Sequence, residues 1–143
     1  MENNRIPRIG EVYAVKFEGN GSVQSGWRPG VVFQNNIGNI HSPNVVVLPL
    51  TTSLKKRDMP THVFIGAKDT GLARDSMVLC ENPQCIPKDE LGKYITTLSD
   101  SYMAQIAAAS ILASGAVSYL DLQSLIQVWQ RAVTVNTAAV GAA

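Results

Sequence analysis

The order of hydrophobic patterns along this chain constrains its fold more than any other feature. Up to residue 80, apolar residues form short runs rich in β-branched and aromatic side chains, bounded by glycine, proline or asparagine. From residue 99 onward they recur at helical spacing instead. Short strands at close intervals followed by helices predict a small sheet or barrel, an α+β fold that is mainly β. The runs lie at residues 12–17, 29–34, 45–50, 62–65 and 76–80.

The run at residues 45–50 is apolar on both faces, which predicts a central strand. Pro49 has no N–H group, so we expect it at a bulge or at a position without a ladder partner. The asparagine-rich segment 35–39 is expected to form a loop. Residues 87–92 are expected to form a short helical turn that Gly92 closes.

Two C-terminal helices are predicted. Ser99 or Asp100 can cap an alanine-rich helix over about residues 99–117, with Gly115 near its end. Ser118 and Asp121 have the spacing of a capping box for a second helix over about residues 118–134. We expect its apolar face to pack on the first helix or on a partner subunit, and residues 136–143 to fray. With a barrel core over about residues 9–98, we expect a single domain of 143 residues.

The charge balance excludes a uniformly basic nucleic-acid-binding surface, since the formal net charge is only +1. The one dense cationic run is Lys55, Lys56 and Arg57, which is either a local basic groove or a solvated loop. Cys80 and Cys85 are expected to be reduced thiols, because no second pair of ligands supports a zinc site.

The chain opens without a signal-peptide pattern, and the apolar stretch at residues 104–117 is short for a membrane span. We therefore expect a cytoplasmic protein that does not enter a membrane.

An arginine and a threonine are the main candidates for chemistry. Arg28 lies between Gly26, which allows close approach of a ligand, and Pro29, which restricts the backbone of Arg28. A guanidinium group matches the oxygens of a phosphate, although Arg28 could also be a structural surface residue. Thr51 ends the third apolar run, where its hydroxyl could donate to a phosphate or cap a turn.

Ordered segments from about residue 9 to about residue 112 resemble the MazF/PemK/Kid-like toxins of type II toxin–antitoxin systems. Each segment is weak by itself, but the ordered set is specific. The segments are EVY at 11–13, GSVQSGWRP at 21–29, VFQNNIGN at 32–39, SP at 42–43, LT at 50–51, PTHV at 60–63 and RDSMVLCE at 74–81.

This resemblance implies a compact SH3-like barrel of the CcdB/Kid/MazF type that forms a homodimer. It implies a metal-independent, sequence-specific endoribonuclease that cleaves single-stranded RNA and uses no cofactor. The partner is a cognate antitoxin, together with which such toxins bind DNA.

Carried over by position, Arg28 and Thr51 match the catalytic arginine and threonine of the family. Glu81 falls where some members place an acidic catalytic residue. Val23 and Gln84 stand where an acidic residue and an arginine are usual, which bears on substrate preference. The residues expected to contact RNA are Ser22, Gln24, Trp27, Thr52, Ser53, Lys55, Lys56, Arg57 and His62.

Three other interpretations stay open. A paired-histidine mechanism would need His41 and His62 to meet. A non-catalytic member of the fold would bind a protein target such as DNA gyrase. An inactive, divergent member would serve only as a partner-binding module.

Overall fold

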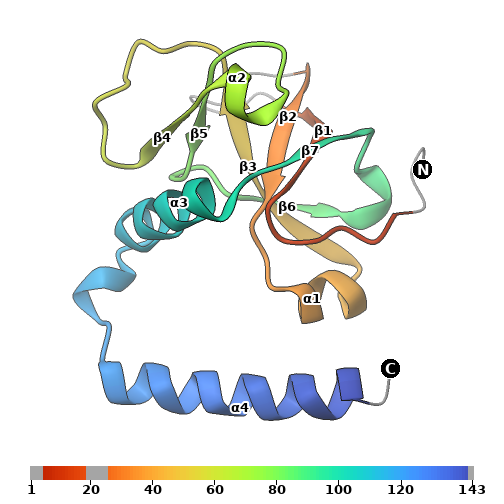
Figure 1. Ribbon diagram of the computed structural model, residues 1–143, viewed down its shortest axis with the longest axis vertical. Helices are drawn as coiled ribbons and strands as arrows, with labels where there is room; N and C mark the ends of the chain where they lie inside the picture. The colour runs from red at the N-terminus through yellow and green to blue at the C-terminus, as the bar shows by residue number, and fades with distance from the viewer. Residues whose placement is uncertain (1–4, 19–25, 142–143) are drawn as a thin grey trace.

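A computed structural model of the chain describes residues 5–18 and 26–141, and the side chains up to residue 134. In these parts an antiparallel, curled sheet forms a half-barrel, and helices follow it (Figure 1). The predicted α+β, mainly β barrel with C-terminal helices is therefore confirmed. The strands are β1 (Glu11–Phe17), β2 (Gly26–Val32), β3 (Asn44–Thr51), β4 (His62–Ile65), β5 (Ser76–Leu79), β6 (Gln84–Pro87) and β7 (Tyr94–Thr97). The helices are α1 (Asn36–His41), α2 (Ala67–Thr70), η1 (Lys88–Glu90), α3 (Asp100–Ala113), η2 (Ala116–Ser118) and α4 (Leu122–Gly141).

Strands β1 to β5 confirm the five predicted apolar runs, whereas β6 and β7 were missed. Both missed strands have four residues, and in both the partly buried residues alternate with exposed ones. So short a half-buried strand contains too few apolar residues to stand out in a sequence. The predicted helical turn within residues 87–92 is confirmed as the single 3₁₀ turn η1, but Leu91 caps it, and Gly92 instead donates its N–H to the Ala14 carbonyl of β1.

Strand β3 organises the sheet because it pairs with three other strands. It pairs with β2 over residues 47–49, with β6 over residues 44–47 and with β5 over residues 50–51. One edge of β3 thus faces β6 at its start and β5 at its end, which curls the sheet. Leu48 and Pro49 lie between these two segments and have a registered neighbour only on β2. Pro49 thus occupies the kind of position predicted for a residue without an N–H group.

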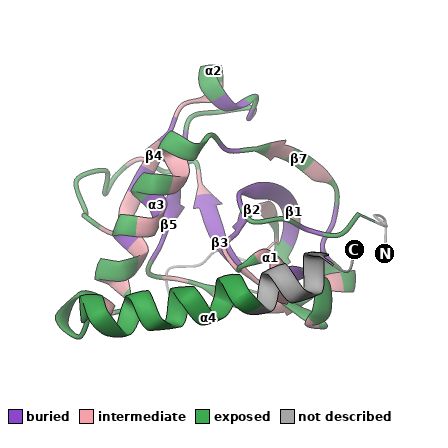
Figure 2. Ribbon diagram, turned by 60° about the horizontal axis from the view of Figure 1, so that its bottom comes forward, coloured by how far each residue is buried: buried purple, intermediate pink, exposed green. Residues whose placement is uncertain are grey.

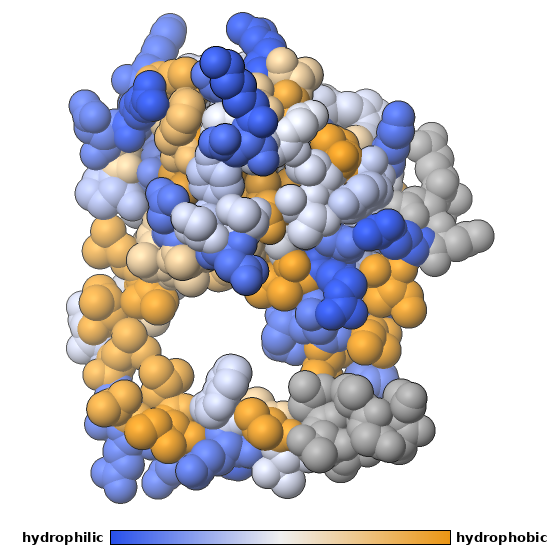
Figure 3. Space-filling model, in the orientation of Figure 1, coloured by the Kyte–Doolittle hydropathy of each residue, from blue (hydrophilic) through white to orange (hydrophobic). Residues whose placement is uncertain are grey.

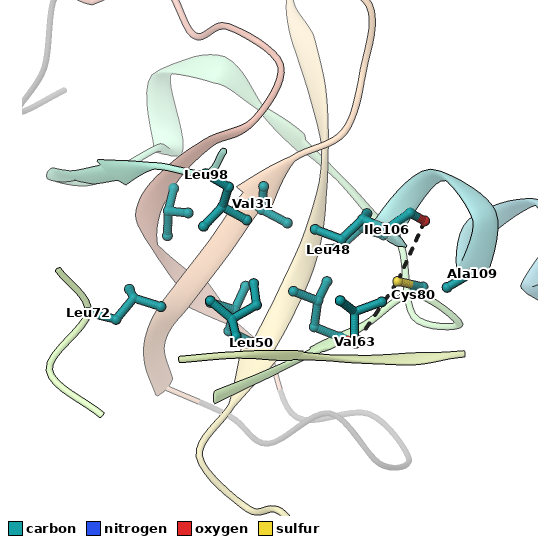
Figure 4. Packing of buried hydrophobic residues seen from close by; sticks show 12 residues of the cluster. Val31, Leu48, Leu50, Val63, Leu72, Cys80, Leu98, Ile106 and Ala109 are labelled. Atoms are coloured by element: carbon teal, nitrogen blue, oxygen red, sulfur yellow. Dashed lines mark hydrogen bonds between the residues drawn. The ribbon is translucent and has the colours of Figure 1, made fainter. Parts of the chain in front are cut away.

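One face of the sheet packs on α3 to form the main core. This cluster includes Leu48 and Leu50 from β3, Cys80 directly after β5, and Ile106 and Ala109 from α3 (Figure 4). Ile106 is fully buried, and the small side chain of Ala109 lets the helix lie close to the sheet. Burial raises the pKa of the Cys80 thiol to about 11, so this group stays protonated at neutral pH.

A buried carboxylate fixes the start of β1. Glu11, which is 3% exposed, accepts hydrogen bonds from the Arg5 guanidinium, from the Arg8 amide at 2.7 Å and from the Tyr13 hydroxyl at 2.9 Å. Burial by itself raises the pKa of Glu11, but the hydrogen bonds from Arg5, Tyr13 and Arg8 outweigh it. The pKa of Glu11 therefore lies below its ordinary value.

The segment at residues 35–39 was wrongly expected to be a loop. Helix α1 occupies residues 36–41, and the Asn35 side chain caps it by accepting a hydrogen bond from the Gly38 amide. At the other end, the Lys88 ammonium donates to the carbonyl oxygens of Asn39 and Ile40. These caps satisfy groups that a six-residue helix leaves open, and Lys88 comes from a distant part of the sequence.

Helix α3 begins as predicted, since the Ser99 side chain accepts a hydrogen bond from the Tyr102 amide. Helix α4 differs from the prediction in three respects. Asp121, not Ser118, accepts the capping hydrogen bond, from the Ser124 amide at 3.0 Å. The helix continues to Gly141, through residues that we expected to fray. It also lies apart from α3, so α3 is not the one of the two expected partners that covers its apolar face (Figure 1). No helix in the described part of the chain is long and apolar enough to cross a bilayer.

Candidate active site

The alternation of side chains along the strands sends one set of residues to the sheet face opposite α3. In β3, Leu50 joins the core under α3, so Thr51 points to the other face. Thr51 pairs with Met77 of β5, and Leu79, two residues further along β5, pairs with His62 of β4. Thr51, Met77, Leu79 and His62 therefore share this face.

A pocket of about 410 Å³ opens on this face. Six residues from the predicted site line it, and they come from three separate stretches of the chain. Three further residues, Met59, Met77 and Leu79, supply apolar walls that the sequence analysis did not single out, although strand alternation in β5 would have placed two of them. The predicted residues in the lining are Thr51, Ser53, Lys55, Lys56, His62 and Glu81.

A histidine and a glutamate form a short side-chain contact in the lining of this pocket. His62 Nδ1 lies 2.8 Å from the carbonyl oxygen of Lys56, and His62 Nε2 lies 2.7 Å from Glu81 Oε2. The imidazole is 6% exposed and the Glu81 side chain 30% exposed. The Lys56 carbonyl oxygen can only accept, so Nδ1 donates to it, and the ring connects the basic loop to the Glu81 carboxylate.

Arg28 lies in β2, where it pairs with Val15 of β1, and its side chain is partly exposed. Strand β2 pairs with β3 in the register Gly30 to Pro49. Continued by two residues on each strand, this register sets Arg28 opposite Thr51, on the same face of the sheet. Arg28 is not among the residues that line the 410 Å³ pocket. Arg28 therefore adds a cationic group to this face of the sheet, outside the lining of the pocket.

Of the other residues predicted to contact RNA, three do not line the pocket, and two are outside the described residues. Trp27 is 58% exposed and lies on the sheet face opposite Arg28, with its ring close to Gly92. The Arg57 guanidinium stacks on the Phe64 ring at 3.9 Å from the ring centroid. Thr52 is exposed and outside the pocket lining. Ser22 and Gln24 lie outside the described residues.

The paired-histidine interpretation finds no support in this arrangement. His41 ends α1, and His62 begins β4, at the far side of the barrel (Figure 1). The titratable partner of His62 is instead Glu81. The sequence carries no local signal for this pair because the two residues are 19 positions apart, and only the β4–β5 register brings them together.

Among the described side chains, no group of three or more histidine, cysteine, aspartate or glutamate residues could hold a metal ion. The polar groups at the pocket are those of Thr51, Ser53, the two lysines, His62 and Glu81.

Comparison with known proteins identifies relatives of this barrel. Residues 8–112 match the family described as PemK-like, MazF-like toxin of type II toxin–antitoxin system. The chain is 44% identical over 89 residues to Endoribonuclease EndoA of Bacillus subtilis (strain 168), which covers 62% of this chain and 77% of that protein. It is 38% identical over 109 residues to Endoribonuclease MazF of Staphylococcus epidermidis, which covers 76% of this chain and 91% of that protein.

A solved structure agrees with these sequence relatives. It is an endoribonuclease in complex with its cognate antitoxin from Mycobacterial species, with a TM-score of 0.64 and 32% sequence identity. The match covers 76% of this chain and 95% of that chain. Both candidate residues Arg28 and Thr51 lie within the family match, whereas α4 lies after it.

Proposed function

The chain belongs to the PemK-like, MazF-like toxins of type II toxin–antitoxin systems, and we propose that it is a sequence-specific endoribonuclease that cleaves single-stranded RNA without a metal. One observation links the activity of the family to a site in this chain. A guanidinium and a hydroxyl, on Arg28 and Thr51, share one face of the sheet, beside a pocket that contains Glu81 and His62.

Cleavage of RNA without a metal makes three chemical demands. The 2′-hydroxyl must lose a proton as its oxygen bonds to phosphorus, the 5′-oxygen must gain a proton as it leaves, and the phosphorane needs its negative charge stabilised. The products are a 2′,3′-cyclic phosphate and a 5′-hydroxyl end. Each demand has a candidate group on the same face of the sheet.

Arg28 is the proposed ligand of the scissile phosphate. Its planar, permanently charged fork suits the equatorial oxygens of the phosphorane. The proton that Glu81 takes from the 2′-hydroxyl is the proposed source of the proton for the leaving 5′-oxygen. Thr51, set opposite Arg28 by the strand register, donates a hydrogen bond to the same phosphate. These two residues stabilise charge that develops only in the transition state.

Glu81 is the proposed base. As a carboxylate at the wall of the pocket, Glu81 can accept the proton of the 2′-hydroxyl. His62 acts as a positioning residue in this scheme, because its two ring nitrogens hold both the carboxylate and the Lys56 carbonyl. The carboxylate is thereby fixed in orientation before the substrate arrives.

Lys55 and Lys56 give the pocket a local positive charge in a chain with a net charge of only +1. We expect them, with Ser53, to contact phosphates that flank the cut site. Messenger RNA is the proposed substrate, so the cytoplasm is the proposed place of action.

A cognate antitoxin and a second copy of the chain are the proposed partners. The mycobacterial relative with 32% identity was solved with its cognate antitoxin. The antitoxin would form with this chain a complex that binds DNA.

A cleavage assay on a mixed single-stranded RNA tests the proposal. In the presence of a chelator we expect discrete fragments that carry 5′-hydroxyl ends, and sequencing these ends gives the cut site. Activity that depends fully on added Mg²⁺ would refute the mechanism. Intact RNA, together with binding to a protein target such as DNA gyrase, would favour the non-catalytic interpretation.

A further inference from the structure

The apolar stripe of α4 has no partner among the described residues. Its side chains recur at the spacing of one helix face, and all of residues 119–134 are exposed (Figure 2). Most of the stability of helices in proteins comes from packing of an amphipathic face, so a helix with its apolar stripe in water lacks this contribution. The exposed fractions in the stripe are Leu122 72%, Leu125 51%, Ile126 46%, Trp129 68% and Val133 45%.

The exposed apolar surface continues from α4 to α3. Ile111 and Leu112 near the end of α3 are 38% and 46% exposed, and Val117 and Leu120 in the connection are 52% and 50% exposed. Figure 3 shows hydrophobic residues from the lower flank of the barrel along the connection and onto α4. We call these four residues and the stripe of α4 the α3–α4 apolar surface.

The charge of α4 restricts what can cover this surface. From residue 122 to residue 134 the helix contains one charged residue, Arg131, which lies on the side opposite the stripe. A highly charged partner finds no complementary group on the stripe. The occupant must itself present an apolar, uncharged helix or groove, and α4 of a second copy does so.

The size of the surface is sufficient for a stable interface. A standard interface buries roughly 800 Å² from each partner. The nine side chains of the α3–α4 apolar surface are between 38% and 72% exposed. If each of these large residues has roughly 150–200 Å² of surface in total, the nine together expose on the order of 700–900 Å² per copy, so an interface of standard size covers nearly all of this surface.

We propose that the α3–α4 apolar surface is an interface between two copies of this chain, with α4 of one copy packed antiparallel along α4 of the other. A two-fold interface requires a surface that complements itself, and an uncharged stripe meets this condition without like-charge contacts. The helix follows the residues that match the family, so this interface is an addition to the barrel. The proposal does not depend on RNA cleavage.

Sedimentation velocity of the full chain tests the interface. Trp129→Asp places a charge in the stripe and should weaken self-association at least tenfold in Kd, whereas Gln127→Asp, on the opposite side of α4, should leave it unchanged. If the barrels also pair, the difference between these two variants still isolates the contribution of α4. An association constant for Trp129→Asp equal to that of the parent chain would overturn the proposal.

Fluorescence gives a second test that does not require a destabilised variant. The chain has two tryptophans, so a Trp27→Phe background leaves Trp129 as the only reporter. We expect its emission to shift to shorter wavelength as protein concentration rises, because a second copy covers the ring. An emission spectrum independent of concentration would mean that no second copy covers Trp129, and would contradict the interface.

Discussion

The imidazole of His62 and the carboxylate of Glu81 face each other with Nε2 2.7 Å from Oε2, while the other ring nitrogen is held by the Lys56 carbonyl. The carbonyl oxygen can only accept, so Nδ1 donates to it. These two contacts of one ring connect the basic loop, β4 and Glu81, which follows β5 by two residues, at the pocket.

The contact between His62 and Glu81 predicts a selective effect of His62→Gln. Glutamine can donate to Glu81 but cannot hold the Lys56 carbonyl at the same time, so the carboxylate loses its fixed orientation. We expect kcat to fall by about 10²-fold, because misplacing a catalytic group by about 1 Å can cost that much. The measurement is a pH–rate profile of RNA cleavage. His41→Gln on exposed α1 is the matched control, and an unchanged profile for His62→Gln would remove His62 from the site.

Arg28→Ala should abolish most of the activity. Loss of one group that stabilises developing negative charge costs about 10²–10³ in kcat. Arg28→Lys should restore little, because a point charge does not replace a planar fork. Single-turnover cleavage rates measure the effect, with Arg8→Ala, a cation outside the pocket, as a control for net charge. A rate within twofold of the parent for Arg28→Ala would refute the assignment.

Thr51→Val should lower kcat while leaving the fold intact, because valine keeps the β-branched shape that suits the end of β3. Thr51→Ser keeps the hydroxyl and should retain most of the rate. A melting curve for each variant separates stability from chemistry. If the valine and serine variants cleave equally fast, the hydroxyl has no catalytic part.

The lysines of the pocket predict a change in salt dependence. Each phosphate contact to single-stranded nucleic acid contributes about −0.7 to the slope of log K against log salt concentration. Lys55→Gln and Lys56→Gln should therefore each make the slope less steep by about 0.7, measured by binding of a short RNA that cannot be cleaved. Lys68→Gln on α2, away from the pocket, is the control. Equal slopes in all three variants would exclude the basic loop from RNA binding.

The buried Glu11 carboxylate predicts a pH dependence of stability. Its pKa is lowered in the folded chain, so its contribution is present above the unfolded pKa, near 4.3, and is lost as pH falls through the folded value. Glu11→Gln should lower the free energy of unfolding at neutral pH by about 1–3 kcal/mol and weaken its dependence on pH below about 5. Urea unfolding over this pH range measures both effects. Exposed Glu18→Gln should change neither, and a parent-like pH dependence in Glu11→Gln would contradict this role.

Local patterns in the sequence predicted those parts of the fold that depend on near neighbours. The apolar runs gave β1 to β5, the Ser99 cap marked the start of α3, and helical spacing identified the apolar stripe of α4. Arg28 and Thr51 were assigned from a family resemblance at matched positions. Their side-chain types alone left a structural role equally open.

Tertiary structure decided which of these residues meet. The register of β2 with β3, extended two residues beyond its last pair, directs Arg28 and Thr51 to the same face of the sheet, and the pairing of β4 with β5 brings His62 to Glu81. Helix α1 was missed because its caps include Lys88, a residue remote in sequence. Pairing register and distant caps are set by the packing of the whole sheet, and nothing in a local stretch of sequence encodes them. The sequence by itself therefore determined the elements and the kinds of chemical group, and the packed sheet determined the site.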